Sequence, residues 1–177
     1  MNKNTEIIYS RMVSASGPQV TVTEVQGDSI KFILWNCDLS LANGLRRVLL
    51  SEIPTMAIDL VEIEDNSSVL TDEFLVHRLG LVPLTTGSIG VQAYKYTRDC
   101  TCSQHCPNCA VELVLDVRCG PDEGTRDVTS HELVSSNANV GPVTFSEDDP
   151  GILLFKLGRK QSVKMRCIAK KVSCHGI

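Results

Sequence analysis

A cluster of four cysteines in one short segment constrains this chain more than any other feature. The cysteines are Cys100, Cys102, Cys106 and Cys109. Four thiolates suit a tetrahedral structural zinc site with Zn–S distances of about 2.3 Å, and a closed four-sulfur site leaves no open position for catalysis. Cys106 and Cys109 have the two-residue spacing common in zinc-binding loops, whereas a single residue separates Cys100 from Cys102. The cluster therefore predicts a loop that closes around a structural metal ion.

The same segment admits three other interpretations. His105 could replace one of the sulfur ligands, an iron–sulfur cluster also takes four cysteines, and the thiols could pair as disulfides. The segment 1–16 has no continuous apolar stretch typical of a secretory signal, so we expect the eight cysteines in a reducing compartment. Clustered cysteines in such a compartment bind metal more often than they form disulfides. Metal is therefore favoured, and spacing alone does not separate zinc from iron.

The composition is that of a folded protein rather than of an autonomous nucleic-acid-binding module. Hydrophobic residues make up 42% and charged residues 21% of the 177 residues, and the net charge is -4. A domain that grips DNA by itself is expected to be basic, because phosphate contacts require lysine or arginine. We therefore expect no direct sequence-specific binding of nucleic acid. No apolar run approaches the roughly 20 residues of a membrane span, so no membrane association is expected.

Alternating apolar residues predict a β-hairpin near the N-terminus, followed by a helix. The strands are 19–25 and 29–36, with a turn between them. Asp38 is the expected N-cap of a helix over 39–51, and Pro54 ends it. Strands outnumber helices in the chain as a whole, which indicates the α+β class.

Further elements are expected after this helix. The patterns predict strands at 57–64 and 110–118, a short helix from Thr71 to Gly80, a helical turn at 129–132, and a second hairpin formed by strands 152–157 and 162–170. In the last strand, Val163, Met165, Cys167 and Ala169 share one face, and Lys164, Arg166 and Lys170 lie on the other.

The helix over 39–51 carries a wider apolar surface than one sheet can cover. Its stripe consists of Leu41, Ala42, Leu45, Val48 and Leu49, and Leu39 and Leu50 lie outside it. A helix of this kind often has two burial partners, its own sheet and another subunit. Gly44 costs about 1 kcal/mol in mid-helix relative to alanine, which a closely approaching second backbone would explain. Pattern alone still favours a buried core helix with a tolerated glycine.

The sequence contains few residues that suggest an active site. Phosphate-binding loops and nucleophile elbows are absent from the sequence. His77 lies near Asp72 and Glu73, which could support acid–base chemistry, but a polar helix face is the favoured interpretation. The acidic pairs at 122–123 and 148–149 are interpreted as solvated turns. No catalytic residue is predicted.

Three segments resemble one protein family closely. Residues 42–59 and 66–84 look like the two signature segments of alpha-like RNA polymerase subunits, and 98–112 is similar to the zinc loop of the third-largest subunits of eukaryotic RNA polymerase II. The resemblance extends from about residue 18 to residue 171. The motifs are long, in order and correctly spaced, so the match is specific.

The resemblance implies a split dimerisation domain with an inserted, mainly β domain. The expected divisions are a flexible arm (1–17), the first dimerisation half (18–53), the inserted domain with its zinc loop (54–169), and the start of the second half (170–177). By resemblance, the helix over 39–51 packs against a smaller alpha-like subunit in the nucleus. That heterodimer nucleates assembly of the large catalytic subunits for mRNA transcription. The partner-facing residues implied are Asn43, Leu45, Arg46, Arg47 and Leu49.

The C-terminal segment departs from the family pattern. Family members continue after the strand that contains Lys171 with a further strand region and a long helix, whereas this chain reads Val172 to Ile177. We therefore expect an incomplete dimerisation domain and impaired assembly. Two alternatives stay open: a free-standing zinc-binding protein-interaction module, and an enzyme with an unrecognised site.

Overall fold

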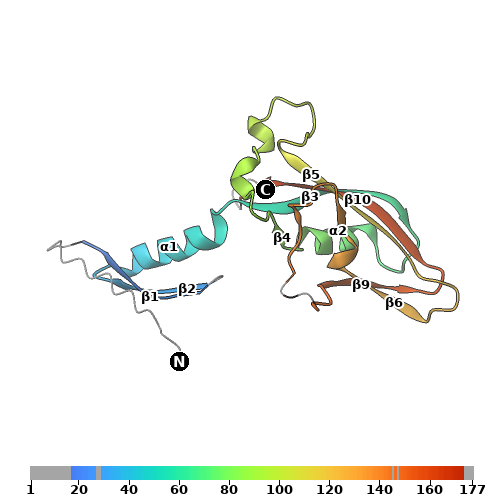
Figure 1. Cartoon of the computed structure of the whole chain (residues 1–177), viewed down its shortest axis with the longest axis horizontal. Helices are drawn as coiled ribbons and strands as arrows, with labels where there is room; N and C mark the ends of the chain where they lie inside the picture. The colour runs from blue at the N-terminus through green and yellow to red at the C-terminus, as the bar shows by residue number, and fades with distance from the viewer. Residues whose placement is uncertain (1–16, 27–28, 145, 147, 174–177) are drawn as a thin grey trace. The chain divides into compact units, whose positions relative to one another are not determined.

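The computed structural model describes residues 17–26, 29–144, 146 and 148–173. The chain divides into two compact units, Met1–Ile53 and Pro54–Ile177 (Figure 1). The predicted N-terminal arm, apart from Gly17, lies outside the described residues, as do Cys174 and the residues after it.

The first unit contains the predicted hairpin and helix. Strands β1 (Gln19–Gln26) and β2 (Ser29–Trp35) pair antiparallel, and α1 spans Leu39–Ser51. The Asp38 carboxylate accepts a hydrogen bond of 2.8 Å from the backbone N–H of Leu41, so the predicted N-cap is confirmed. This bond satisfies one of the donors that a helix start leaves unpaired.

The described residues of the first unit form no buried core. None of the described side chains in the ranges 17–26 and 29–53 is buried, and α1 has no buried residue. Most of the large apolar side chains that the structure leaves exposed lie here, including Trp35 at 54%, Leu50 at 72% and Leu39 at 86% exposure. The interpretation of α1 as a buried core helix is therefore wrong for the chain by itself. Local hydrogen bonding forms these elements, but apolar burial does not stabilise them.

The second unit is built on a four-stranded antiparallel sheet in the order β3-β10-β5-β7. Its strands are β3 (Thr55–Asn66), β10 (Ser162–Val172), β5 (Ala110–Arg118) and β7 (Val134–Ser135). Two smaller sheets pair β4 (Leu84–Thr85) with β8 (Gly141–Pro142), and β6 (Thr125–Thr129) with β9 (Leu153–Gly158). Three short 3₁₀ helices complete the unit, η1 (Val91–Ala93), η2 (Thr97–Asp99) and η3 (Ser130–Glu132).

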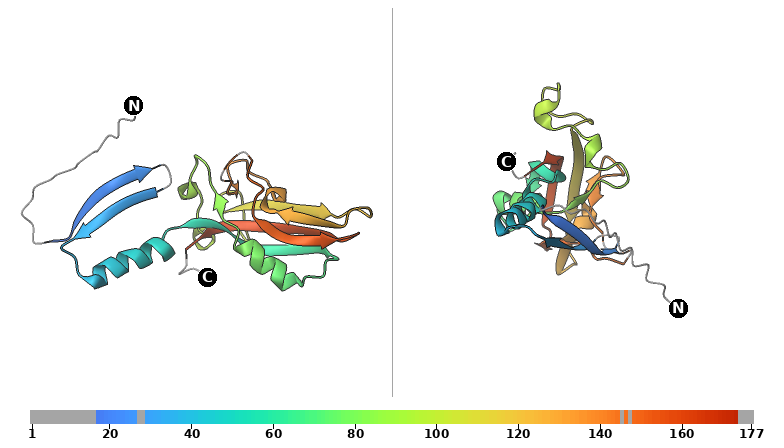
Figure 2. Two further views of the ribbon diagram at one scale, coloured as in Figure 1. Left: turned by 90° about the horizontal axis from the view of Figure 1, so that it is seen from below. Right: turned by 90° about the vertical axis from the view of Figure 1, so that its left-hand side faces the viewer.

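The core of this unit lies between the central sheet, helix α2 (Asp72–Gly80) and the β6–β9 pair. Leu75 and Leu79 of α2 are fully buried in one cluster with Leu113 of β5 and Leu157 of β9. Figure 2 shows α2 alongside the long strands. The predicted faces of β10 are confirmed, because the odd-numbered residues from Val163 to Ala169 belong to this core.

The predicted hairpin of the last two strands is wrong. β9 pairs with β6, whereas β10 pairs with β3 on one side and β5 on the other. A tight turn joins β9 to β10, in which Gln161 N–H donates to Gly158 O at 3.1 Å and Lys160 has a φ of 60°. The turn looks local in sequence, but it redirects the chain from one sheet into another. The predicted second dimerisation half begins at residue 170, within β10, which continues through Val172.

Two predicted helix starts form without their expected capping bonds. Thr71 and Thr129 occupy the N-cap positions of α2 and η3, but neither side chain makes a capping hydrogen bond. Glu132, the last residue of the capping-box pattern, instead pairs with Arg126 at 2.8 Å. At η3, Arg126 therefore takes the carboxylate that the local pattern assigned to the cap.

Candidate functional site

The four cysteines lie in a loop between η2 and β5. The backbone N–H groups of Cys109 and Ala110 both donate to Cys106 O at 2.9 Å, which forms a tight turn between the last two cysteines. Cys100 N–H donates to Thr97 O at 3.2 Å, which directs the first cysteine toward the same point. The loop thus folds back on itself and brings both cysteine pairs together.

The sulfur atoms lie close enough together to surround a single metal ion. The four Sγ atoms all lie within 4.8 Å of one another. Cys100 and Cys106 are 3.6 Å apart, Cys102 and Cys109 are 3.6 Å apart, and Cys106 and Cys109 are 3.8 Å apart. A tetrahedron with metal–sulfur distances of about 2.3 Å has edges of about 3.8 Å. The four cysteines can therefore hold one metal ion.

The alternatives to a four-cysteine site fit the geometry less well. His105 is not part of the group of converging ligand atoms. The sulfur separations exceed the S–S bond length of about 2.05 Å, and all four cysteines are free thiols. A multi-iron cluster binds its cysteines through different iron atoms, which requires more widely spaced sulfurs. The arrangement favours one ion.

The thiols differ strongly in acidity. A hydrogen bond with the Cys102 backbone, with smaller contributions from neighbouring thiols, lowers the pKa of Cys100 to about 7. The thiol–thiol hydrogen bond with Cys100, together with burial, raises the pKa of Cys102 to about 12. Burial raises the pKa of Cys109. Cys100 therefore ionises before Cys102, and a bound cation has to displace the proton of Cys102.

The loop covers one position on the outer face of the central sheet. Ile168 of β10 is 1% exposed and belongs to a small cluster with Cys109 and Ala110, against which the other three cysteines pack. Its neighbours on this face, Arg166 and Lys170, carry charges and form ion pairs with Glu62 and Asp59. Ile168 was not among the predicted site residues. The sequence signal for its role is an apolar residue on the strand face that otherwise carries Lys164, Arg166 and Lys170.

The five predicted partner-facing residues lie on α1, and most of them are exposed. Asn43, Arg46, Arg47 and Leu49 are exposed, and Leu45 is half-buried. Arg46 donates two hydrogen bonds from Nε and Nη2 to the Asn43 amide oxygen, at 3.2 and 2.9 Å. This pair holds one guanidinium against the helix.

Three of the acidic residues considered as candidates accept hydrogen bonds from nearby residues. Asp72 accepts a hydrogen bond of 2.6 Å from the Asn66 amide nitrogen, and His77 is exposed on α2. Glu123 accepts from Gly120 N–H and Asp149 accepts from Gly151 N–H, as expected of turn residues.

Across the described residues, no helix is long and apolar enough to cross a membrane.

Known proteins resemble this chain over most of its length. DNA-directed RNA polymerase II subunit rpb3 of Dictyostelium discoideum is 51% identical over 158 residues, which cover 87% of this chain and 51% of the relative. Subunit RPB3 of Schizosaccharomyces pombe is 46% identical over 161 residues, 88% of this chain and 54% of the relative. The archaeal subunit Rpo3 of Methanosarcina acetivorans is 35% identical over 153 residues, 85% and 53% respectively.

The chain spans about half the length of these relatives. The family model described as the RNA polymerase Rpb3/RpoA insert domain matches residues 61–173, which include the cysteine loop and all of the central sheet except the start of β3. This chain therefore belongs to the RNA polymerase Rpb3/RpoA insert-domain family.

Proposed function

We propose that this chain is a non-catalytic assembly subunit of a nuclear, DNA-directed RNA polymerase II. In this role, α1 pairs with a smaller alpha-like subunit, and the heterodimer recruits the large catalytic subunits for mRNA synthesis. One observation carries the proposal. The first unit forms a hairpin and a helix, yet none of its described side chains is buried. An amphipathic element of this kind gains its stability from packing against a partner.

The exposed surface of α1 fits a helical partner. Leu41, Val48 and Leu49 lie on one stripe and are each about half exposed. A Cβ added at Gly44 would meet no atom within 4 Å, so the described chain itself does not require a glycine there. A partner backbone at this position would account for it, because glycine permits the closest approach of two helices. Asn43, Leu45, Arg46, Arg47 and Leu49 are the proposed contacts.

The cysteine loop supplies the second part of the proposal, a structural Zn²⁺ ion. Zinc favours tetrahedral four-thiolate coordination, and such closed sites are structural. In this role the ion fixes the loop against Ile168 and the outer face of the sheet. The donor set and the sulfur separations support a single ion of this type.

The assembly role can be tested by co-expressing the chain with the smaller alpha-like subunit in zinc-supplied cells. Native mass spectrometry is expected to detect one copy of each chain and one zinc ion. Leu49→Glu is expected to abolish the heterodimer because it places a charge in an apolar interface. The matched control is Val69→Glu, since Val69 is 84% exposed in the second unit.

A longer version of the chain, extended to the full length of its relatives, separates two causes of failure. If only the longer version binds the partner, the assembly role holds and residues beyond this chain are required for it. If neither version binds, the assembly role is contradicted. A zinc-loaded chain without a partner would then support the second candidate, a free-standing zinc-binding interaction module. The observation in its favour is that the second unit has its own buried core.

A further inference from the structure

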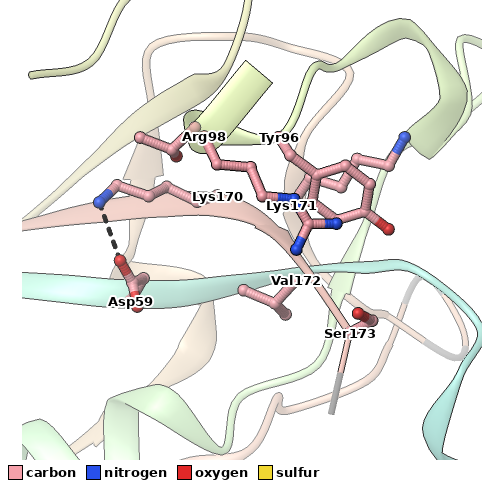
Figure 3. Close-up of a pocket in the computed structure, with 8 residues that line it drawn as sticks. Asp59, Tyr96, Arg98, Lys170, Lys171, Val172 and Ser173 are labelled. Atoms are coloured by element: carbon pink, nitrogen blue, oxygen red, sulfur yellow. Dashed lines mark hydrogen bonds and ion pairs between the residues drawn. The ribbon is translucent and has the colours of Figure 1, made fainter. Parts of the chain in front are cut away.

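A cavity of about 230 Å³ lies between η2 and the C-terminal end of β10 (Figure 3). Its wall contains three cations, Arg98, Lys170 and Lys171, together with Asp59 and the ring of Tyr96. The whole chain has a net charge of -4, so a concentration of positive charge in one cavity is a local exception. The cavity belongs to neither the cysteine cluster nor α1.

One of the three cations is already neutralised within the protein. Lys170 Nζ lies 2.8 Å from Asp59 Oδ2, and the Lys170 side chain is 12% exposed. Figure 3 shows the Lys170 ammonium group directed toward Asp59 and away from the Tyr96 ring. This pair joins β10 to β3 and closes one end of the cavity. It leaves Arg98 and Lys171 to set the charge at the other end.

Arg98 is oriented but not neutralised. Its guanidinium lies 4.6 Å from the centroid of the Tyr96 ring, a stacking geometry that fixes the group while its in-plane N–H donors stay free. Among the described residues, its ion-pair partner is Asp99, at 4.0 Å and with both side chains more than 60% exposed. Such a pair contributes little. The guanidinium can therefore donate two hydrogen bonds to a carboxylate in the bidentate geometry that arginine favours.

Lys171 places a second cation against the same ring. Its Nζ lies 4.8 Å from the Tyr96 centroid and donates to Tyr94 O at 3.1 Å. An ammonium group has three donors, so donors remain for a ligand, and the described residues offer Lys171 no carboxylate partner. Tyr96 thus holds two cations near one cavity, and among the described residues their one ion pair is the exposed contact between Arg98 and Asp99.

We propose that this cavity binds the carboxylate side chain of an acidic peptide segment from a partner protein, with Arg98 as the principal contact and Lys171 as the second. A nucleic acid is a poorer fit, because Asp59 lines the wall and two free cations cannot follow a phosphate backbone. The volume admits a single acidic side chain with part of its backbone. The inference is independent of the pairing proposed for α1.

The test uses the full, zinc-loaded chain and a fluorescently labelled, glutamate-rich peptide. Fluorescence anisotropy is expected to show saturable binding that weakens with added salt, and a glutamine-rich peptide of the same length is expected not to bind. Arg98→Gln is expected to weaken binding about tenfold or more, the effect of one lost charge-assisted hydrogen-bond pair. Arg159→Gln removes an exposed arginine elsewhere in the second unit and is expected to leave binding unchanged.

Two further variants test the arrangement rather than the charge alone. Tyr96→Phe keeps the ring and is expected to retain binding, whereas Tyr96→Leu removes the stacking surface and is expected to weaken it. Equal binding of the glutamate and glutamine peptides would overturn the proposal, as would equal effects of Arg98→Gln and Arg159→Gln. Displacement of a bound peptide by inorganic phosphate at low concentration, with no peptide selectivity, would assign the cavity to a free anion instead.

Discussion

Ile168 of β10 is buried against Cys109, so the cysteine loop and the central sheet share one small apolar cluster on the face opposite the main core. The contact joins the candidate metal centre to the longest strand pairing in the second unit, because β10 pairs with both β3 and β5. Metal binding and sheet stability are therefore expected to depend on each other.

Ile168→Ala tests this coupling. The change removes buried methyl groups beneath the loop and is expected to lower the free energy of unfolding by about 2–4 kcal/mol. It is also expected to speed the loss of metal to a chelator, because the loop loses the surface on which it packs. Urea unfolding and chelator kinetics measure the two effects.

The matched control for this change is Leu60→Ala. Leu60 lies directly opposite Ile168 on β3 and is 46% exposed. It is expected to cost less than about 1 kcal/mol and to leave metal release unchanged. Equal effects of the two variants would show that the loop does not depend on Ile168.

The pH dependence of metal affinity follows from the low pKa of Cys100. Thiolates bind the ion, so protons compete with it and affinity falls as the pH falls. Above the pKa of about 7, Cys100 is already ionised in the metal-free chain, and below it one further proton has to be released. The slope of log affinity against pH is therefore expected to steepen by about one below pH 7. Competition titrations with a chelator from pH 6 to pH 8 measure it, and Cys100→Ser is expected to remove the change in slope.

Gly44→Ala separates helix stability from partner binding. A Cβ at this position would meet no atom within 4 Å, so alanine is expected to stabilise α1 by about 0.5–1 kcal/mol and to raise the helix signal in circular dichroism. The same change is expected to weaken the heterodimer, because it blocks close approach of the partner helix. Higher helicity with undiminished pairing would place the interface on another face of α1.

Gly151 is required for a different reason. Its φ of 77° is a conformation that favours glycine, and an added Cβ would clash with the imidazole of His131. Gly151→Ala is expected to destabilise the second unit by about 1–3 kcal/mol in urea unfolding. A background His131→Ala change is expected to restore only part of this loss, because the backbone strain persists. Gly124→Ala, where a Cβ meets no atom within 4 Å, is the control and is expected to be close to neutral.

Local signals in the sequence predict local structure well here. The Asp38 cap and the alternation of β10 describe the start of α1 and the faces of the strand correctly. The cysteine spacing predicts a converging cluster. Strand pairing is not a local property, which is why the expected β9–β10 hairpin is wrong. The role of Ile168 could not be read without knowing that the loop folds over the outer face of the sheet.

The exposure of the first unit could also not be predicted from the pattern of apolar residues in the sequence. An apolar stripe on α1 predicts burial, but it does not say whether the chain itself or another protein provides the covering surface. The structure leaves Leu39, Leu50 and Trp35 more than half exposed. This is the physical basis for the proposal that α1 is completed by a partner.

Hydrogen–deuterium exchange across α1, with and without the smaller alpha-like subunit, tests the central claim most directly. The account predicts rapid exchange of the Leu39–Ser51 amides in the chain by itself, since no side chain of this helix is buried. It predicts strong protection of the same amides in the complex, while the core strand β5 stays protected in both states. Unchanged exchange in α1 when the two chains are bound would contradict α1 as the pairing surface.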